Sequence, residues 1–354
     1  ALFLPLLTQL DLMVSGVEDG NYTMDPEFTE GLYSLLSAAM MTSSSQQYIQ
    51  EHSVFEIIAY LLQRATPVHL TVSFLDRIIA LLESPKLSKD LHNQLFKTFF
   101  QNSALWVYCP ADLQIRVYDY IREAFVTKEN EEIVTCIRSY GIKGFTDTIR
   151  YYYNELEIEI SEELNEERGY LKQWLVLNGE FVHPLSGEVV ATCLPADECK
   201  HVRSSIFNIL NELIQDDTLL TNEALFNLVN TILSCSRNNN TTLMIEFLQL
   251  LDRILQTDAR CQKFISLLTV FSHVSLDLTG FETPEIPSQT SVMQGSALME
   301  EQKPSELITE TPSLKAGILP FFLALLQLKQ PTVTTITLTT LVRLIVLCDH
   351  MPAL

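Results

Sequence analysis

The sequence predicts an all-α protein, an armadillo- or HEAT-like α-solenoid of stacked helix pairs or triplets. Three observations support this fold class. Apolar residues make up 47% of the 354 residues and recur at helical spacing along most of the chain. Glycine is scarce, with 11 residues. One short sequence also returns at intervals typical of armadillo and HEAT repeats, in which each unit leaves an apolar face that its neighbour covers.

Helical periodicity returns between ordinary stop signals such as Ser84-Pro85 and Gln330-Pro331. The predicted helices lie at 2–15, 27–41, 46–63, 67–83, 87–101, 111–126, 129–140, 143–157, 196–215, 221–235, 241–256, 259–273, 315–329 and 332–348. Threonines are frequent in the last of these and favour a strand in isolation. Its apolar residues nevertheless follow the helical period, so we predict a helix.

The stretch from Asn102 to Phe125 joins two of these helices and indicates how they pack. Pro110 suits the first turn of a helix, where its missing N–H has no partner to lose. One apolar stripe follows at helical spacing, formed by Leu113, Val117, Tyr120, Ile121, Ala124 and Phe125. We expect Trp106 and Tyr108, on the short connection before Pro110, to wedge between neighbouring helices.

An internal echo indicates the repeat. Residues 74–79 (Phe-Leu-Asp-Arg-Ile-Ile) resemble residues 250–255 (Leu-Leu-Asp-Arg-Ile-Leu), and residues 341–345 (Leu-Val-Arg-Leu-Ile) form a weaker third copy. Four steps of about 44 residues lead from Asp76 to Asp252, and two of about 45 lead on to Val342, within the armadillo and HEAT range. We expect the aliphatic residues of the echo to be core, and its Asp and Arg to be solvated or locally paired.

Two segments interrupt the helical rhythm. Within 155–195, seven glutamates between Glu155 and Glu167 precede residues 179–194, whose Pro, Ser and Gly between β-branched runs predict a small hairpin or loop excursion. Residues 277–313 are rich in Pro, Ser, Thr and Glu and are predicted to be a linker. The predicted organisation is therefore a helical-repeat region at 1–276, the linker at 277–313, and a further repeat at 314–354 that is truncated at its end.

Composition excludes several classes of partner. Lys and Arg number 23 against 44 Asp and Glu, a formal charge of −21, so the chain would repel nucleic acid and anionic membrane surfaces. A basic segment of another protein is an allowed partner. The longest apolar run, 316–326, is shorter than the roughly 20 residues of a membrane span. We therefore predict no nucleic-acid binding and no membrane insertion by this segment.

No catalytic chemistry emerges from the sequence. The only candidate metal cluster, His183, Cys193, Cys199 and His201, has irregular spacing and lacks the tight pairs of zinc sites. Phosphate-binding glycine loops and nucleophile motifs are absent. The glutamate run suits a solvated acidic patch better than a catalytic pair, which needs a cleft that shifts one pKa. The seven scattered cysteines indicate buried reduced thiols. We expect a non-enzyme without cofactors or metals and cannot assign partner-binding residues.

Three consecutive tyrosines, Tyr151 to Tyr153, end a helical pattern. Consecutive residues of a helix point in different directions, so at least one of these rings should be exposed. Packing at a contact between helices explains the others.

Leu105-Trp106-Val107-Tyr108-Cys109-Pro110-Ala111, then Gln114, Tyr118 and Tyr120, resembles a segment of the neurobeachin group of BEACH proteins. Ile137-Arg138 and the run from Ile149 to Tyr153 follow in the same order at similar distance. The segment lies in the armadillo-like region of that family, N-terminal to the PH–BEACH–WD40 end. Cys109 departs from the expected threonine, and the acidic run with its hairpin has no counterpart in the resemblance. The chain also begins without Met, so we expect a piece of a larger protein.

The resemblance implies a large cytosolic scaffold that associates peripherally with membranes and acts in vesicle trafficking and cargo sorting by binding proteins. Trafficking components would be its partners, and the full-length protein would also bind the regulatory subunit of protein kinase A. One alternative is an acidic solenoid that binds basic protein segments, as nuclear transport receptors do. Another is an enzyme with an unrecognised site in 155–201.

Overall fold

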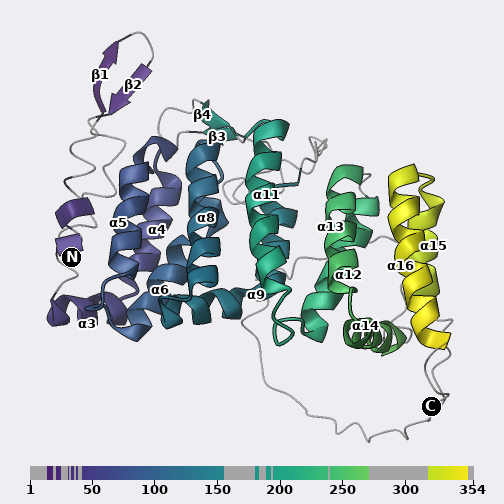
Figure 1. The fold of residues 1–354 in the computed structure, drawn as a ribbon. Coiled ribbons are helices and arrows are strands. Elements are labelled where there is room, and N and C mark those ends of the chain that lie inside the picture. The colour runs from purple at the N-terminus through teal and green to yellow at the C-terminus, as the bar shows by residue number, and fades with distance from the viewer. Residues whose placement is uncertain are drawn as a thin grey trace, which may run out of the picture. The chain divides into compact units, whose positions relative to one another are not determined.

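The computed structural model describes residues 14–18, 21–24, 31, 33–35, 37–38, 42–154, 180–182, 189–192, 194–237, 240–270 and 318–349. The chain divides into two compact units, residues 1–247 and 248–354. The division falls inside one helix, α13 (Thr241–Ile254). Each unit is mainly helical (Figure 1).

The helices of unit 1 before the division are α3 (Ser43–Glu51), α4 (Val54–Arg64), the 3₁₀ turn η2 (Pro67–His69), α5 (Val72–Leu82), α6 (Lys89–Phe99), α7 (Ser103–Trp106), α8 (Ala111–Thr127), α9 (Glu131–Tyr152), α11 (Ala196–Leu213) and α12 (Asn222–Arg237). Unit 2 contains the end of α13 with α14 (Asp258–Val270), α15 (Ile318–Gln327) and α16 (Pro331–Asp349). The predicted all-α solenoid is confirmed.

Most predicted helices lie within a few residues of their observed bounds, and the exceptions have local causes. The single helix predicted at 46–63 is two helices, because Ser53 adopts a left-handed conformation with φ 48°. The helices predicted at 129–140 and 143–157 are merged into α9 but separated by a sharp bend at Gly141 (φ 61°, ψ −172°). The short connection before Pro110 contains a helical turn, α7.

Two small hairpins accompany the helices. Strands β3 (Glu180–Val182) and β4 (Val189–Thr192) pair antiparallel, as the sequence predicts for 179–194. Strands β1 (Val14–Glu18) and β2 (Asn21–Met24) also pair antiparallel. The helix predicted at 2–15 is therefore wrong at its end, because Val14 begins a strand; its earlier residues lie outside the described part of the chain.

Most of unit 1 is built from triplets of helices, and side chains at corresponding positions of successive triplets touch; α12 and the start of α13 follow the third triplet as two helices. α3, α4 and α5 form one triplet, and α6, α7 and α8 form the next. The two halves of α9 on either side of Gly141, together with α11, form a third. Figure 1 shows the third members, α5, α8 and α11, side by side. A helix triplet is the armadillo form of the repeat.

Polar contacts link each member of a triplet to its counterpart in the next. Among first members, Gln50 of α3 bonds Asp90 of α6, and Lys89 bonds Glu132 of α9, at separations of 40 and 43 residues. Among the second, Gln63 bonds Asn102 next to α7 at a separation of 39. These separations match the predicted repeat length. The period of the sequence is therefore the number of residues between side chains that touch in neighbouring repeats.

Unit 2 contains one further triplet, formed by α14, α15 and α16. Asp252 at the end of α13 contacts Arg343 of α16 directly, at a sequence separation of 91 residues. The count of two repeat steps between Asp252 and Val342 is therefore wrong. One step and the intervening segment, which contains 277–313, account for the separation. That linker lies outside the described residues, so the domain organisation stays a prediction. The count of four steps from Asp76 to Asp252 is wrong as well, because α5, α8, α11 and α13 are successive neighbours and span three steps.

The core of unit 1 is aromatic around the junction between the first two triplets. Trp106 is 1% exposed, and its indole Nε1 donates to the Phe99 carbonyl at 2.7 Å. Its ring lies 6.1 Å from that of Phe74, centroid to centroid. The predicted wedge is thus present for Trp106, while Tyr108 is half-buried.

Candidate functional site: polar networks and an exposed helical face

The candidate metal ligands are not brought together in the part of the chain that the structure describes. Cys199 is buried and His201 is exposed on the same helix, α11. His183 and Cys193 lie outside the described residues, as does the glutamate run from Glu155 to Glu167. Among the residues described, no group of three or more His, Cys, Asp or Glu side chains could hold a metal ion.

Five of the described cysteines are buried thiols that take part in no disulfide: Cys109, Cys136, Cys199, Cys235 and Cys261. Burial raises the pKa of the Cys109 thiol to about 12. It also raises the pKa values of Cys136 and Cys235 to about 11. A thiol must lose its proton to act as a nucleophile or metal ligand, so these three groups are poorly suited to either role at neutral pH.

The residues that carry the family resemblance form a buried hydrogen-bond network. Gln114 is fully buried in α8, and its Nε2 donates to the carbonyl oxygens of Val107 and Cys109 at 3.2 and 2.6 Å. Its Oε1 accepts from the Tyr153 hydroxyl at 2.7 Å. The side chain therefore fixes the turn before α8 and also ties α8 to the end of α9.

The hydroxyl of Tyr118 completes this network. It lies 3.1 Å from Ser103 Oγ and 3.2 Å from the Tyr153 hydroxyl. Burial raises the pKa values of both tyrosines, so both stay protonated and act as neutral hydrogen-bonding groups. Satisfied buried networks of this kind specify one packing arrangement. The network is structural, because its polar atoms bond one another and the backbone.

One fully buried cation links three helices of unit 1. Arg203 of α11 has no exposed side-chain surface, and its guanidinium pairs with both carboxylate oxygens of Glu246 in α13, at 2.6 and 3.1 Å. Its Nη1 also donates to the Tyr153 carbonyl at the end of α9. A buried guanidinium needs such partners because an unpaired charge in the interior is costly.

The aspartates of the sequence echo both reach to the next third-member helix. In unit 1, Asp76 of α5 pairs with Arg116 of α8 at 2.6 Å. In unit 2, Asp252 accepts from Nη1 of Arg343 in α16 at 2.8 Å. These aspartates therefore form contacts between neighbouring helices, which is consistent with the local pairing expected for them.

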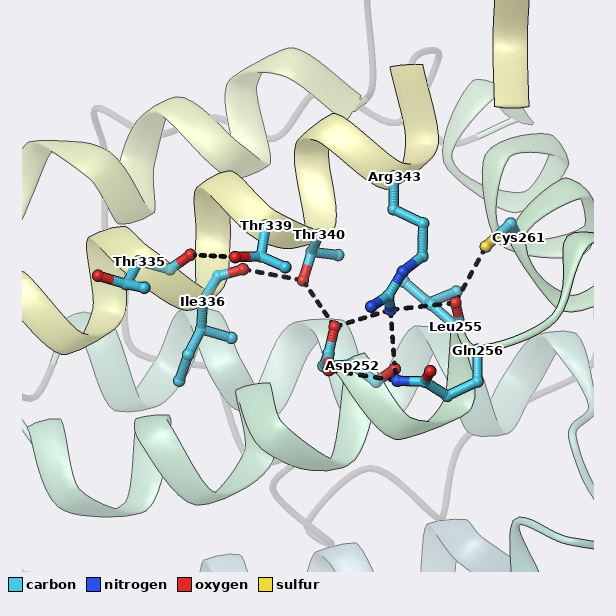
Figure 2. A network of polar contacts seen from close by, with 9 residues as sticks. All are labelled: Asp252, Leu255, Gln256, Cys261, Thr335, Ile336, Thr339, Thr340 and Arg343. Atoms are coloured by element: carbon cyan, nitrogen blue, oxygen red, sulfur yellow. Dashed lines mark hydrogen bonds and ion pairs between the residues drawn. The ribbon is translucent and has the colours of Figure 1, made fainter. Parts of the chain in front are cut away.

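Figure 2 shows the network around Asp252 in unit 2. Arg343 Nη1 also donates to the carbonyl oxygens of Asp252 and Leu255 at 3.3 and 3.2 Å. These carbonyls end α13, where cations are favoured by the helix dipole. The Thr340 hydroxyl lies 3.5 Å from the Asp252 carboxylate. The arrangement holds α16 against the end of α13 and leaves Arg343 with several partners.

Exposed apolar side chains gather on one helix. On α16 these are Leu338 (44% exposed), Val342 (58%), Ile345 (50%) and Val346 (49%). Among described side chains, no other helix carries more than two large exposed apolar residues.

Tyr151 of α9 is exposed at 59%, so at least one ring of Tyr151–Tyr153 is accessible, as predicted, while Tyr153 is buried at 1% exposure.

Sequence reasoning missed the buried polar residues. Gln114 and Tyr118 lie beside the predicted apolar stripe of α8 and are buried, whereas Tyr120 and Ala124 of that stripe are only half-buried. Arg203 gave no local signal, because its partner Glu246 is 43 residues away. A search for polar pairs separated by one repeat would have found this ion pair and those of Asp76 and Lys89.

Stacked helix triplets, joined by polar side chains at the contacts between helices, are the architecture of an α-solenoid. The family model described as "Neurobeachin/BDCP, DUF4704 alpha solenoid region" matches residues 1–273. The chain belongs to this neurobeachin family, as the residues around Trp106 and Gln114 indicate.

Two curated relatives carry the name "Putative neurobeachin homolog". The one from Caenorhabditis briggsae is 33% identical over 134 residues, and the one from Caenorhabditis elegans is 31% identical over 134 residues. The matched region covers 36% of this chain and 5% of each relative. No solved structure matches the chain. Within the described residues, no helix is both long and apolar enough to cross a bilayer.

Proposed function

We propose that this segment is a non-catalytic scaffold within a large BEACH-family protein that acts in vesicle trafficking and cargo sorting by binding other proteins. The observation that supports this role is its membership of the neurobeachin α-solenoid family over residues 1–273. A solenoid holds an extended surface in a fixed shape along which partners bind. Partner specificity would come from exposed side chains such as Tyr151.

The full-length protein would be cytoplasmic and peripherally associated with membranes, and its partners would be trafficking components. The regulatory subunit of protein kinase A is a further proposed partner of the full-length protein. Residues 277–313 would serve as a linker between the helical region at 1–276 and the repeat at 314–354.

Proximity labelling and pull-down with residues 1–354 as bait test this role. The matched control bait is Trp106→Ala, which removes a buried side chain of the core and should weaken folded-state binding without changing surface charge. Enrichment of vesicle-trafficking proteins by the unsubstituted bait over this control supports the scaffold. Recovery of basic nuclear cargo that dissociates as salt rises would instead favour the acidic-solenoid alternative, since exposed charges are screened by salt.

A further inference from the structure

The outer face of α16 has the pattern of an unfinished interface. Leu338, Val342, Ile345 and Val346 follow one another at offsets 0, 4, 7 and 8, so they form one stripe of the helix. The opposite side is already buried in unit 2, through Val333, Thr337, Thr340 and Leu344. The helix therefore carries two faces suited to packing, of which one is covered.

The sequence echo aligns one residue of the exposed stripe with residues whose contacts are known in two other helices. Val342 stands in the echo where Asp76 and Asp252 stand. Asp76 reaches from α5 to Arg116 of the next third-member helix, and Asp252 reaches from α13 to Arg343 of the next. In both instances this position points toward the following repeat. By this correspondence, Val342 marks the side of α16 on which a following repeat would lie.

The chemistry of the stripe defines what could cover it. Between Pro331 and Val346 the only charged residue is Arg343, which is paired with Asp252 on the already covered side. The exposed face is thus uncharged in a chain of formal charge −21. It offers no charge to a basic or acidic peptide, and an aliphatic stripe of another helix matches it.

We propose that the exposed stripe of α16 is the docking face for a further helical repeat of the same longer polypeptide. That repeat packs an uncharged aliphatic face against Val342 and Ile345, in place of the ion pair made by Asp76 and by Asp252. The relatives leave ample polypeptide for it, because the matched 134 residues are 5% of their length. This inference does not depend on a role in trafficking.

Thiol accessibility in the longer protein tests the proposal. Val342→Cys is prepared both in residues 1–354 and in the full-length protein, and its labelling by a maleimide is compared with that of the unsubstituted chains. Labelling should be slower in the full-length protein by about tenfold or more, because a covered thiol reacts only when the contact opens locally. The matched control, Val126→Cys on α8, starts from a similarly exposed valine (51%) and should label equally in both.

Equal rates for Val342→Cys in the two proteins would overturn the proposal. Protection that appears only as protein concentration rises would also overturn it, since a second copy of the chain would then cover the stripe.

A second variant tests the same face in case Val342→Cys fails to fold. Val342→Asp should speed hydrogen exchange of α16 in the full-length protein and leave it unchanged in residues 1–354, where Val342 faces solvent. Unchanged exchange in both proteins would contradict a covered face.

Discussion

At the scale of single residues, the buried polar side chains around α7 and α8 hold helices together. The indole of Trp106 donates to the Phe99 carbonyl. Gln114, Tyr118 and Tyr153 hydrogen-bond to one another or to nearby backbone carbonyls. A buried polar group that loses its partner costs free energy comparable to a lost hydrogen bond or more. Such residues are therefore constrained by stability, even though their types are common in active sites.

Replacement of Trp106 by alanine should lower the free energy of unfolding by roughly 3–5 kcal/mol, because a large buried ring leaves a cavity. The Phe99 carbonyl would also lose its indole donor. Denaturant unfolding followed by circular dichroism measures the change. Val126→Ala, at an exposed position, serves as the control and should change stability by less than about 0.5 kcal/mol. An equally small effect of Trp106→Ala would contradict the buried wedge.

The buried thiols predict a loss of stability at alkaline pH. Burial raises the pKa of Cys109 to about 12 from its ordinary value of 9.0. The folded chain therefore keeps a proton that the unfolded chain releases. The stability that this buried thiol contributes is fully present below pH 9. It is lost as the pH rises from 9 toward the folded-state pKa, at up to about 1.4 kcal/mol per pH unit. Urea unfolding at pH 8 and pH 10 should show a smaller fall for Cys109→Ala than for the unsubstituted chain. Equal falls would place the thiol in solvent.

At the scale of elements, one glycine and a few interhelical pairs determine how the helices of unit 1 meet. Gly141 divides α9 into the first and second members of a triplet. Its backbone lies in a region that essentially only glycine adopts. The pairs between neighbouring helices differ in burial, from the fully buried Arg203 to the half-exposed Asp76 and Arg116. Their energetic contributions should differ accordingly.

Gly141→Ala should destabilise the chain by about 1–3 kcal/mol, the cost of holding a non-glycine residue in that backbone region. No heavy atom lies within 4 Å of an added Cβ, so the effect would come from the backbone alone. The measurement is the shift in the denaturation midpoint relative to Ser139→Ala, an exposed change on the same helix. A stabilising Gly141→Ala, as at an ordinary helical glycine, would argue against the bend.

Glu246→Ala should cost about 3–5 kcal/mol, because it leaves the Arg203 guanidinium buried without its counter-ion. Asp76→Ala breaks a pair of similar length, but both side chains are about half exposed, and the loss should be about 0–1 kcal/mol. The two variants are compared by urea unfolding under the same conditions. Similar losses would mean that burial does not distinguish the two pairs.

At the scale of the molecule, stability should depend on nearest neighbours. In a stack of repeats, each unit contacts only those beside it, so a local defect stays local. The described contacts within unit 1 and within unit 2 follow this pattern, since the interhelical ion pairs and hydrogen bonds join helices of neighbouring repeats.

Asp252→Ala tests this locality by hydrogen–deuterium exchange read by mass spectrometry. The substitution removes the carboxylate that Arg343 and Thr340 contact. Exchange should rise in α16 and at the end of α13, and peptides from α5 and α8 should keep their rates. The control is Asp119→Ala, an exposed change in α8, which should leave α16 unaffected. A uniform rise along the chain would indicate one cooperative core instead.

Most of the helices, the approximate repeat length and the family resemblance follow from the sequence alone, because apolar periodicity and the residues around Trp106 are local signals. The sequence also predicted the β3–β4 hairpin from turn residues. The fold, in contrast, was needed to show which polar residues pair, because Arg203 lies 43 residues from Glu246 and Asp252 lies 91 residues from Arg343. It likewise showed that α16 exposes an aliphatic stripe. A helical period identifies apolar positions, but which of them are covered depends on the neighbouring helices.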